Sequence, residues 1–392
     1  MIREPISSTL PPIRIAIIRR HYRPDGGAER SLKRTLEALR DEADLDISLI
    51  TQVWRDGPEP GFRLIEVGKP GWTRAGKHKR FVRAVQAVMQ RERFDLVQSN
   101  ERVPGCQIFR AGDGVHRQWL ALRARQGDAL ARWSWRVSGF HREVLAAEKA
   151  LFAHPDLRRV ICISDMVRND VLEHYPQTDP GLLKVIYNGI DLDRFAPSSR
   201  PPADRYTELG LDPAAPTALF VGSGFARKGL AALLEALVEA AGGWQLIVVG
   251  RDKHLPAYRR QAARLGLARR VHFAGVQTHV QPWYALADVV VHPAEYEPFG
   301  NVILEAMASG RGVIASTRCG GAELIESGVN GVRVPPGDVA AIAAALSSCA
   351  DRARLSAFGL AARRTAESFP LSRLRDEMLG LYREVLDEVR AL

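Results

Sequence analysis

The sequence contains little of what disulfide-rich, metal-binding or membrane-spanning proteins are made of. Among its 392 residues are four cysteines, Cys106, Cys162, Cys319 and Cys349, and no two of them form a Cys-x-x-Cys pair. A disulfide framework and a cysteine metal site are therefore disfavoured, and a reducing compartment is expected. No apolar run approaches the roughly 20 residues that a membrane-spanning helix needs. Residues 1–12 also lack the apolar core of a secretory signal peptide, and we expect a floppy leader there.

What the chain has is the composition of a soluble globular protein, with 46% hydrophobic and 26% charged residues. Its length predicts two or three domains. The formal net charge is +10, and it is spread unevenly: residues 1–190 carry 32 cationic against 23 anionic side chains, and residues 191–392 carry 23 against 22. This asymmetry indicates an acidic partner for the first half, and nucleic acid, an anionic membrane surface and an anionic acceptor all remain open.

Strand and helix patterns alternate along the chain, which is typical of α/β proteins with parallel sheets. Strands are expected at 13–18, 46–51, 63–67, 95–99, 107–110, 159–164, 184–187, 217–221, 245–249, 271–274, 288–292, 312–315 and 331–334. Residues 196–206 are rich in Pro, Ser and Arg and are interpreted as a linker between two sets of alternating elements. A last helix is expected at 372–392, after the break that Pro370 imposes.

The stretch 292–321 organises the rest of the chain. A buried strand runs into it, and two prolines hold the following residues out of a helix. A helix is expected from Gly300 to Ser309, with Asn301 as its cap and Gly310 as the left-handed residue that ends it. Strand, loop and helix together aim backbone N–H groups, and the positive end of the helix dipole, at an anion outside the carboxyl end of the strand.

Glu297 and Glu305 lie on either side of that helix start. By helix rise alone, two carboxylates eight residues apart are separated by about 12 Å. This is too far for a general acid and base that act on one bond, but it suits two clamps on a long ligand. A nucleotide sugar has that layout, with ribose hydroxyls at one end, hexose hydroxyls at the other and a diphosphate between them.

Two further loops have the composition of a phosphate cradle, in which glycine lets the backbone come close to an anion. Gly26 and Gly27 follow the first strand and precede a helix, although a plain turn explains them equally well. The loop 222–229 follows the strand at 217–221. Its Arg227 and Lys228 place positive charge where a departing nucleoside diphosphate would become negative.

The sequence Glu-Pro-Phe-Gly-Asn-Val-Ile-Leu-Glu-Ala, which carries Glu297 and Glu305, resembles the signature of the retaining family 4 glycosyltransferases. The resemblance implies the α/β GT-B fold, in which two Rossmann-like βαβ domains face each other across a cleft. It assigns the acceptor to an N-terminal domain, 1–187, and the nucleotide sugar to a C-terminal domain, 188–371, with the helix 372–392 packed back on the first domain. It also implies that Glu297 lies near the donor hexose, that Glu305 binds the ribose, and that Arg227 and Lys228 act on the diphosphate in place of a metal.

The same resemblance gives the candidate site. Asp113 and His116 lie in a glycine-flanked loop after the strand 107–110 and are expected near the reacting hexose. In the lipopolysaccharide core glucosyltransferases, an Asp stands at the position of Asp113. Together with Glu297, Arg227 and Lys228, they form the candidate catalytic group. The expected donor-binding residues are Gly26, Gly27, Gly222, Arg227, Lys228, Arg251, Val276, Glu297, Phe299, Gly300, Asn301, Val302 and Glu305.

No metal and no other cofactor is expected. Asp191 and Asp193 have the spacing of a metal-binding Asp-x-Asp motif, but they lie in a turn at the domain junction rather than beside a donor-sized cradle. No general base is identifiable among the candidate residues. The departing phosphate oxygen is therefore expected to accept the proton of the acceptor, as the resemblance implies, and electrostatic stabilisation of the leaving group is expected to carry most of the catalysis.

The expected reaction is the transfer of a hexose, guessed to be glucose from UDP-glucose, to a hydroxyl of a glycan or glycolipid with retention of configuration. The lipopolysaccharide core is one acceptor that the resemblance implies. However, the residues just after Glu297 follow the wider family rather than the core glucosyltransferases, so the sugar and the acceptor stay open. The alternatives are a nucleotide-sugar 2-epimerase of the same fold and a non-catalytic basic protein that binds membrane or nucleic acid.

Two basic stretches bear on location. The helix expected at 77–90 begins with four cationic side chains, Lys77, Lys79, Arg80 and Arg83, and the helical stretch 117–153 interleaves arginines with tryptophans. Each stretch is either a solvated helix face or a surface for anionic lipid headgroups. The expected location is cytoplasmic, with peripheral contact to the inner face of the membrane left open. The expected partners are a nucleotide sugar and an anionic glycan or glycolipid acceptor, without nucleic acid.

Overall fold

The computed structural model describes residues 12–22, 27–54, 61–68, 72–126 and 138–391. The chain divides into two compact units. The N-terminal unit comprises Met1–Ile163, Val167–Ile186 and Arg375–Leu392, and the C-terminal unit comprises Ser164–Met166 and Tyr187–Leu374. Gly26 and the expected leader lie outside the described residues, as do the tryptophans at 133 and 135.

Parallel strands form the centre of the N-terminal unit. In its described part they make a seven-stranded sheet with the order β5-β3-β1-β6-β7-β8-β9. The strands are β1 (Ile13–Ile18), β3 (Leu45–Thr51), β5 (Arg63–Glu66), β6 (Leu96–Ser99), β7 (Ile108–Arg110), β8 (Arg159–Cys162) and β9 (Leu183–Val185). The central β1 is a run of apolar residues because it is covered on both faces, and Ile15, Ile17 and Ile18 are at most 1% exposed.

A separate two-stranded parallel sheet is formed by the segments that follow β1 and β3 in the chain. It consists of β2 (His21–Tyr22) and β4 (Val53–Trp54). The rings of Tyr22 and Trp54 stack with their centroids 4.1 Å apart. The helices of the unit are α1 (Gly27–Leu39), α2 (Arg74–Arg91), α3 (His116–Gln126), α5 (Gly139–Phe152) and α6 (Asp165–His174), and the 3-10 helix η1 spans Pro180–Leu182. Helix α2 packs on α5.

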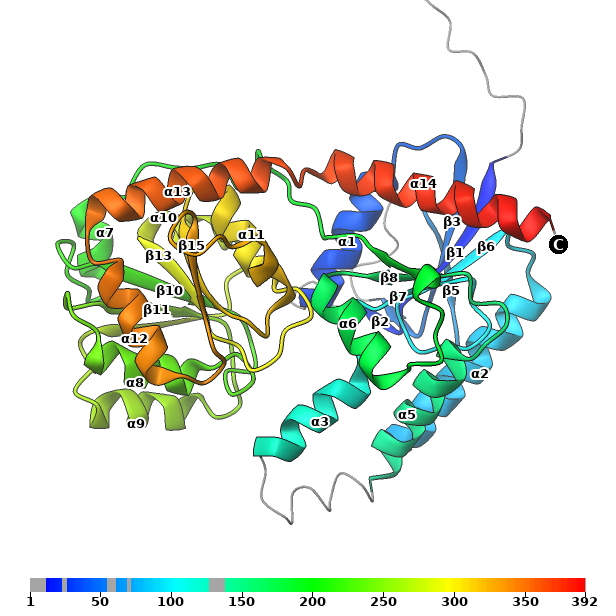
Figure 1. The fold of residues 1–392 in the computed structure, drawn as a ribbon, viewed down its shortest axis with the longest axis horizontal. Helices are drawn as coiled ribbons and strands as arrows, with labels where there is room; N and C mark the ends of the chain where they lie inside the picture. The colour runs from blue at the N-terminus through cyan, green and yellow to red at the C-terminus, as the bar shows by residue number, and fades with distance from the viewer. Residues whose placement is uncertain (1–11, 23–26, 55–60, 69–71, 127–137, 392) are drawn as a thin grey trace, which may run out of the picture. The chain divides into compact units, whose positions relative to one another are not determined.

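The last helix, α14 (Leu371–Arg390), belongs to the N-terminal unit from Arg375 onward. Its buried residues follow helical spacing, as the amphipathic pattern predicts. Tyr382 donates a 2.9 Å hydrogen bond to Gln98 at the end of β6. Arg159 of β8 pairs with Glu384 and Glu388 of the same helix. These contacts place α14 against the N-terminal sheet (Figure 1).

The C-terminal unit repeats the architecture. Its described residues form a six-stranded parallel sheet with the order β12-β11-β10-β13-β14-β15. The strands are β10 (Thr217–Val221), β11 (Gln245–Val249), β12 (Val271–Gly275), β13 (Val289–His292), β14 (Gly312–Ser316) and β15 (Gly331–Val334). Helices α8 (Leu230–Glu239), α9 (Leu255–Arg264) and α12 (Val339–Ser348) cover one side, and α10 (Gln281–Leu286), α11 (Asn301–Ala308) and α13 (Arg352–Glu367) cover the other (Figure 1).

Each expected strand is present, with its ends shifted by two residues or fewer. The sequence-based prediction was wrong or incomplete at three helices, α7 (Ala203–Glu208), α9 and α13. The proposed linker ends in helix α7, whose Tyr206 is buried and donates to the carbonyl of Leu286. Gly320–Leu324 forms the 3-10 helix η2, and helices α9 and α13 were not predicted.

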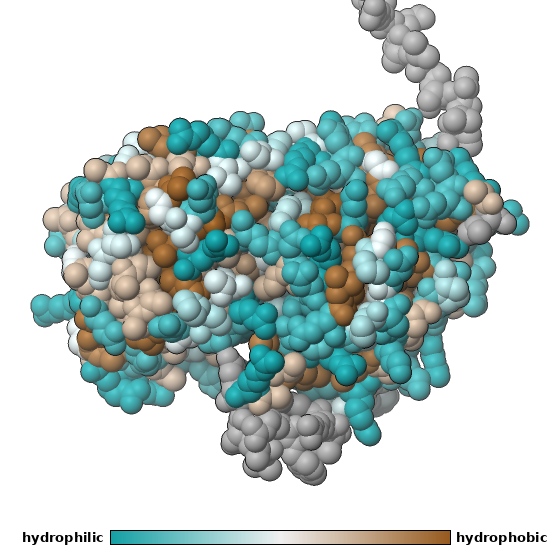
Figure 2. All heavy atoms as spheres, in the orientation of Figure 1, coloured by the Kyte–Doolittle hydropathy of each residue, from teal (hydrophilic) through white to brown (hydrophobic). Residues whose placement is uncertain are grey.

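All four cysteines are free and buried. None of the described helices combines the length and the apolarity needed to cross a bilayer. On the face drawn in Figure 2, hydrophilic side chains surround smaller hydrophobic patches, which is ordinary for a folded protein surface.

Candidate functional site

The start of helix α11 forms the centre of the candidate site. Strand β13 ends at His292, and the chain reaches the helix through a loop that turns at Gly300. Gly300 is the N-cap with φ 82°, a conformation that glycine adopts without strain. The expectation that Asn301 caps the helix was therefore wrong: Asn301 is the first helical residue, and its Oδ1 accepts a 2.8 Å hydrogen bond from Asn188. Gly310 has φ 69° just after the helix, as expected.

Glu297 meets both predicted cations. Its Oε2 accepts hydrogen bonds from Arg227 Nη1 at 2.6 Å and from Lys228 Nζ at 2.8 Å. Arg227 also donates to the carbonyl of Tyr296 at 3.1 Å. Burial by itself would raise the pKa of the Glu297 carboxyl, but Lys228 and then Arg227 outweigh it and hold the pKa well below the usual range. Glu297 is therefore an anion at any working pH.

The side chain of Lys228 is buried and packs against Gly222. A Cβ atom at Gly222 would come within 2.4 Å of Lys228 Cδ and 2.6 Å of Cε, so any larger residue there would displace the lysine side chain from this position. Gly229, with φ 76°, then caps α8, and a Cβ there would come within 2.2 Å of the carbonyl oxygen of Pro293. The glycines of the loop 222–229 thus hold a lysine against the loop that leads to α11.

The loop that follows β11 supports the glycine loop 222–229. Gly250 has φ 134°, and a Cβ there would come within 2.0 Å of the carbonyl oxygen of Gly222. Asp252 Oδ2 accepts a 2.7 Å hydrogen bond from the backbone N–H of Phe225. The N–H of Arg251 donates to Ser223 Oγ at 3.2 Å. The structure therefore brings Arg251 to the same loop cluster as Arg227 and Lys228.

Glu305 points into the unit from the middle of α11. It is 2% exposed, and Tyr284 of α10 donates a 2.8 Å hydrogen bond to its Oε2. Of the apolar residues expected at the donor, Phe299 and Val302 are also buried, whereas Val276 is exposed after the end of β12. The helix therefore presents Glu305 from a packed, well-fixed position.

Asp113 in the N-terminal unit has an arginine partner. Its Oδ2 accepts a 3.0 Å hydrogen bond from Arg19, which follows the end of β1, and Arg19 also lies 3.6 Å from Glu101. Parallel strands place their carboxyl ends at one edge of a sheet, which is where ligands of α/β proteins bind. Gly27 begins α1 after the same strand β1, so it also lies near this edge.

His116 begins α3, and its backbone is held by a buried glutamate. Glu148 of α5 accepts hydrogen bonds from the N–H groups of His116 at 2.8 Å and Arg117 at 3.2 Å. It also accepts from Arg102 at 3.1 Å and Tyr175 at 2.7 Å. The side chain of His116 lies 3.1 Å from a ring nitrogen of His141. Burial, followed by the charge of Arg102, lowers the pKa of His116 to about 4, so the ring is neutral near pH 7.

Comparisons with known proteins identify the family of this chain. A protein-family model described as glycosyltransferase family 4 matches residues 25–194, and a second family model, described as glycosyl transferases group 1, matches residues 215–352. The alpha-maltose-1-phosphate synthase of Mycolicibacterium smegmatis is 31% identical over 286 residues, which cover 69% of this chain and 70% of that protein. The chain belongs to the family 4 glycosyltransferases.

This glycosyltransferase is also 28% identical over 313 residues to the lipopolysaccharide glucosyltransferase WaaG of Escherichia coli K12, over 78% of this chain and 80% of that one. The crystal structure of WaaG superposes with a TM-score of 0.79 at 26% identity and covers 93% of this chain and 98% of its own. The α/β GT-B fold expected from the sequence is thereby confirmed. The relatives include proteins named as a glucosyltransferase and as a mannosyltransferase of lipopolysaccharide and as a D-inositol 3-phosphate glycosyltransferase, so the family alone fixes neither the hexose nor the acceptor.

The Asp-x-Asp sequence of this glycosyltransferase closes a turn. Asp191 Oδ1 accepts from the N–H groups of Asp193 at 3.1 Å and Arg194 at 2.9 Å. Within the described ranges, no group of three or more His, Cys, Asp or Glu side chains is placed to hold a metal ion.

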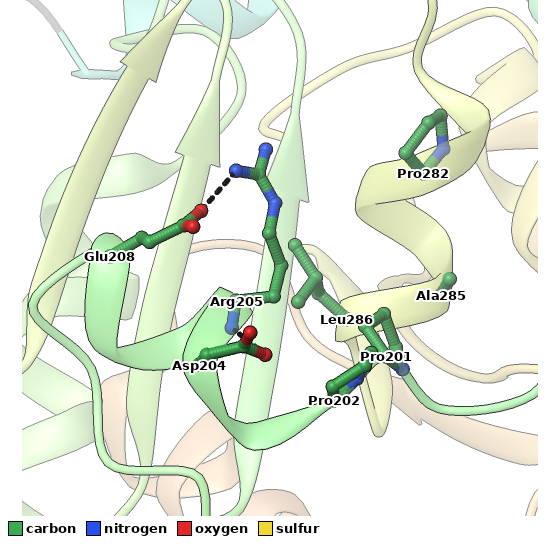
Figure 3. A pocket seen from close by; sticks show the side chains of 8 residues that line it. All are labelled: Pro201, Pro202, Asp204, Arg205, Glu208, Pro282, Ala285 and Leu286. Atoms are coloured by element: carbon green, nitrogen blue, oxygen red, sulfur yellow. Dashed lines mark hydrogen bonds and ion pairs between the residues drawn. The ribbon is translucent and has the colours of Figure 1, made fainter.

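A pocket of about 400 Å³ lies elsewhere in the C-terminal unit, between α7 and α10. Figure 3 shows its lining, Pro201, Pro202, Asp204, Arg205, Glu208, Pro282, Ala285 and Leu286. In the figure, the one guanidinium in the lining is paired with Glu208, at 2.7 Å. None of the candidate residues lines this pocket, so we do not place the glycosyl donor there.

Several residues of the site were not selected from the sequence. Glu148 accepts a hydrogen bond from the backbone of His116, and Tyr284 donates one to Glu305. Both come from helices that are distant in the sequence, and no local motif marks them. Arg19 follows a predicted strand, and its position there is a signal that could have identified it. His292 carried a similar signal, since it ends the strand that leads to Glu297.

Proposed function

We propose that this family 4 glycosyltransferase transfers a hexose from a nucleoside diphosphate sugar to a hydroxyl group of a glycan or glycolipid. The proposal rests mainly on one observation: Arg227, Lys228 and Glu297 meet at a single carboxylate oxygen beside the start of α11. In that role, Arg227 and Lys228 bind the diphosphate, Glu297 orients the hexose, and Glu305 binds the ribose hydroxyls. The N–H groups at the start of α11 add positive potential at the phosphates.

The proposed chemistry is retaining and independent of metal. Two fixed cations supply the charge that would otherwise come from a metal ion, and they act where the leaving diphosphate becomes more negative. The departing phosphate oxygen accepts the proton of the attacking hydroxyl. His116 is neutral near pH 7, and with Asp113 it contacts sugar hydroxyls near the point of attack.

The proposed donor is UDP-glucose, and the proposed acceptor is the lipopolysaccharide core or a similar anionic glycolipid. The 28% sequence identity to a lipopolysaccharide glucosyltransferase supports both assignments. We place the enzyme in the cytoplasm, in peripheral contact with the inner face of the membrane. The side chain of Trp72, which is 96% exposed just before α2, and the exposed Lys79, Arg80 and Arg83 of α2 support such a contact.

The test of the function is turnover with a panel of nucleotide sugars, scored with and without lipid A–core fragments and simple glycans. We expect nucleoside diphosphate release that depends on an acceptor, and a product whose anomeric configuration matches that of the donor. Release of free sugar and nucleotide without any acceptor would instead identify a 2-epimerase. An inverted product would exclude the retaining mechanism.

A binding experiment tests the assignment of Glu305. The change Glu305→Gln keeps the size of the side chain and removes the charge that accepts two ribose hydroxyls, so nucleoside diphosphate affinity should fall by about tenfold or more. The change Glu326→Gln, at an exposed position of the same unit, is the control for the loss of one negative charge. Equal affinities of the two variants would show that Glu305 does not bind the ribose.

A further inference from the structure

Three side chains surround one oxygen atom of Glu297. Arg227 and Lys228 donate to Oε2, and His292 Nε2 lies 3.9 Å from the same atom. The two cations are the groups that the proposed function assigns to the donor diphosphate. In the structure the carboxylate therefore occupies the place of a phosphate group, and an arriving diphosphate must compete with it.

His292 is fully buried, and the described residues offer its ring no hydrogen bond. It is 0% exposed, and within the described part of the chain neither of its ring nitrogens has a hydrogen-bond partner. Buried polar atoms in native proteins are nearly always paired, so this ring needs an explanation. Burial, followed by the charge of Lys228, lowers its pKa to about 3. The neutral ring carries one N–H group, which can donate one hydrogen bond.

The ring and the glutamate share one surface. A Cβ atom at Gly300 would lie 3.5 Å from His292 Nε2 and 3.3 Å from Glu297 Cγ. The edge of the ring that carries Nε2 and the stem of Glu297 therefore both lie against the glycine that starts α11. A shift of the carboxylate by about 1 Å would bring Oε2 within hydrogen-bond distance of Nε2.

We propose that Glu297 changes partners when the donor binds, and that His292 is the positioning residue that receives it. The proposal rests on the function proposed above, in which the diphosphate binds Arg227 and Lys228. The diphosphate takes both cations and repels the carboxylate, which then accepts a hydrogen bond from His292 Nε2. This hydrogen bond holds Glu297 in the orientation that contacts the hexose.

Calorimetric binding of nucleoside diphosphates to Glu297→Gln tests the competition. The probe is whichever of UDP, ADP and GDP binds the wild type most tightly; it carries no hexose, so loss of a hexose contact cannot affect its affinity. We expect about tenfold tighter binding than in the wild type, because the diphosphate no longer displaces a carboxylate. Turnover of the nucleotide sugar should fall in the same variant, and Glu326→Gln should leave both quantities unchanged.

The outcomes separate the two proposals. Unchanged or weaker diphosphate binding by Glu297→Gln overturns the exchange of partners and leaves the donor site in place. Failure of all three diphosphates to bind the wild type overturns both the exchange and the proposed function.

Two variants of His292 test the positioning role. His292→Phe keeps a ring and removes both nitrogens, and it should lower kcat by about 10- to 100-fold, the range found when the hydrogen-bond partner that orients a metal ligand is removed. Its affinity for the diphosphate should stay within about twofold, since the cations are untouched. His292→Gln restores a donor and should recover part of kcat. Wild-type kcat in His292→Phe contradicts the role, and so does a parallel loss of diphosphate binding and thermal stability in both variants. The Glu297→Gln result does not depend on whether His292→Phe folds.

Discussion

Removal of Glu148 should destabilise the N-terminal unit more than removal of any surface charge. Its carboxylate is 1% exposed and accepts four hydrogen bonds, from the Arg102 guanidinium, two backbone N–H groups at the start of α3 and the Tyr175 hydroxyl. In Glu148→Ala, the buried guanidinium of Arg102 loses its counterion. Removing one partner of a buried pair costs about 3–5 kcal/mol. For a unit of this size, that corresponds to a fall in Tm of about 10 °C.

Two further variants isolate the cause. Glu148→Gln keeps an acceptor oxygen but loses the charge, and since charge-assisted hydrogen bonds are roughly twice as strong as neutral ones, it should cost about half as much. Glu384→Gln removes a half-exposed carboxylate that pairs with Arg159, and such exposed pairs contribute about 1 kcal/mol or less. The assay is thermal and urea unfolding, monitored by fluorescence. Each transition is analysed separately, because a chain with two units need not unfold in one step. A loss in Glu148→Ala no larger than that of Glu384→Gln would refute the reasoning.

Three other predictions concern the donor loops, pH and the membrane. Gly250→Ala should lower the free energy of unfolding by about 3 kcal/mol and abolish diphosphate binding, because its Cβ would lie 2.0 Å from the Gly222 carbonyl oxygen. The control is Gly243→Ala, with φ 65° and no atom within 4 Å of its Cβ, which should lower the free energy of unfolding by about 1 kcal/mol in the same assay. Burial, above all, lowers the pKa values of His78 and His116 to about 4. Their contribution to stability is therefore present above pH 6.5 and is lost as the pH falls toward 4. Tm should decline from pH 6.5 to 5, and His78→Phe should make that decline smaller. Reversing the charges at Lys79, Arg80 and Arg83 should abolish sedimentation with anionic vesicles and spare turnover of a water-soluble acceptor; sedimentation equal to the wild type would exclude this face as the membrane contact.

Much of the fold could be predicted because its strands are continuous apolar runs. Strands such as β1 and β10 are covered on both faces, and their Ile, Val and Leu residues stand out from the polar helices between them. Helices α9 and α13 were missed because arginines and alanines make up much of both, which leaves few large apolar side chains to mark a helix. At Gly300, the need for a left-handed residue outweighed the capping preference of Asn301.

The candidate site was predictable as far as its local motifs reached. The residues of the glycine loop and of the Glu297 stretch were selected because glycines, cations and carboxylates recur at short spacing. The direct pairing of Glu297 with Arg227 and Lys228 was not predicted, because it joins positions about 70 residues apart. The same holds for the hydrogen bond from Tyr284 to Glu305 and for the four donors that meet at Glu148. Contacts of this kind depend on how strands are ordered in a sheet, which composition and spacing do not report.

The most direct test of the central claim is a crystal structure of the protein with the nucleoside diphosphate that it binds most tightly. We expect phosphate oxygens within hydrogen-bond distance of Arg227 and Lys228, ribose hydroxyls on Glu305, and the Glu297 carboxylate moved from the cations to His292. A nucleotide bound elsewhere, for example in the pocket between α7 and α10, or phosphates without contact to either cation, would contradict it.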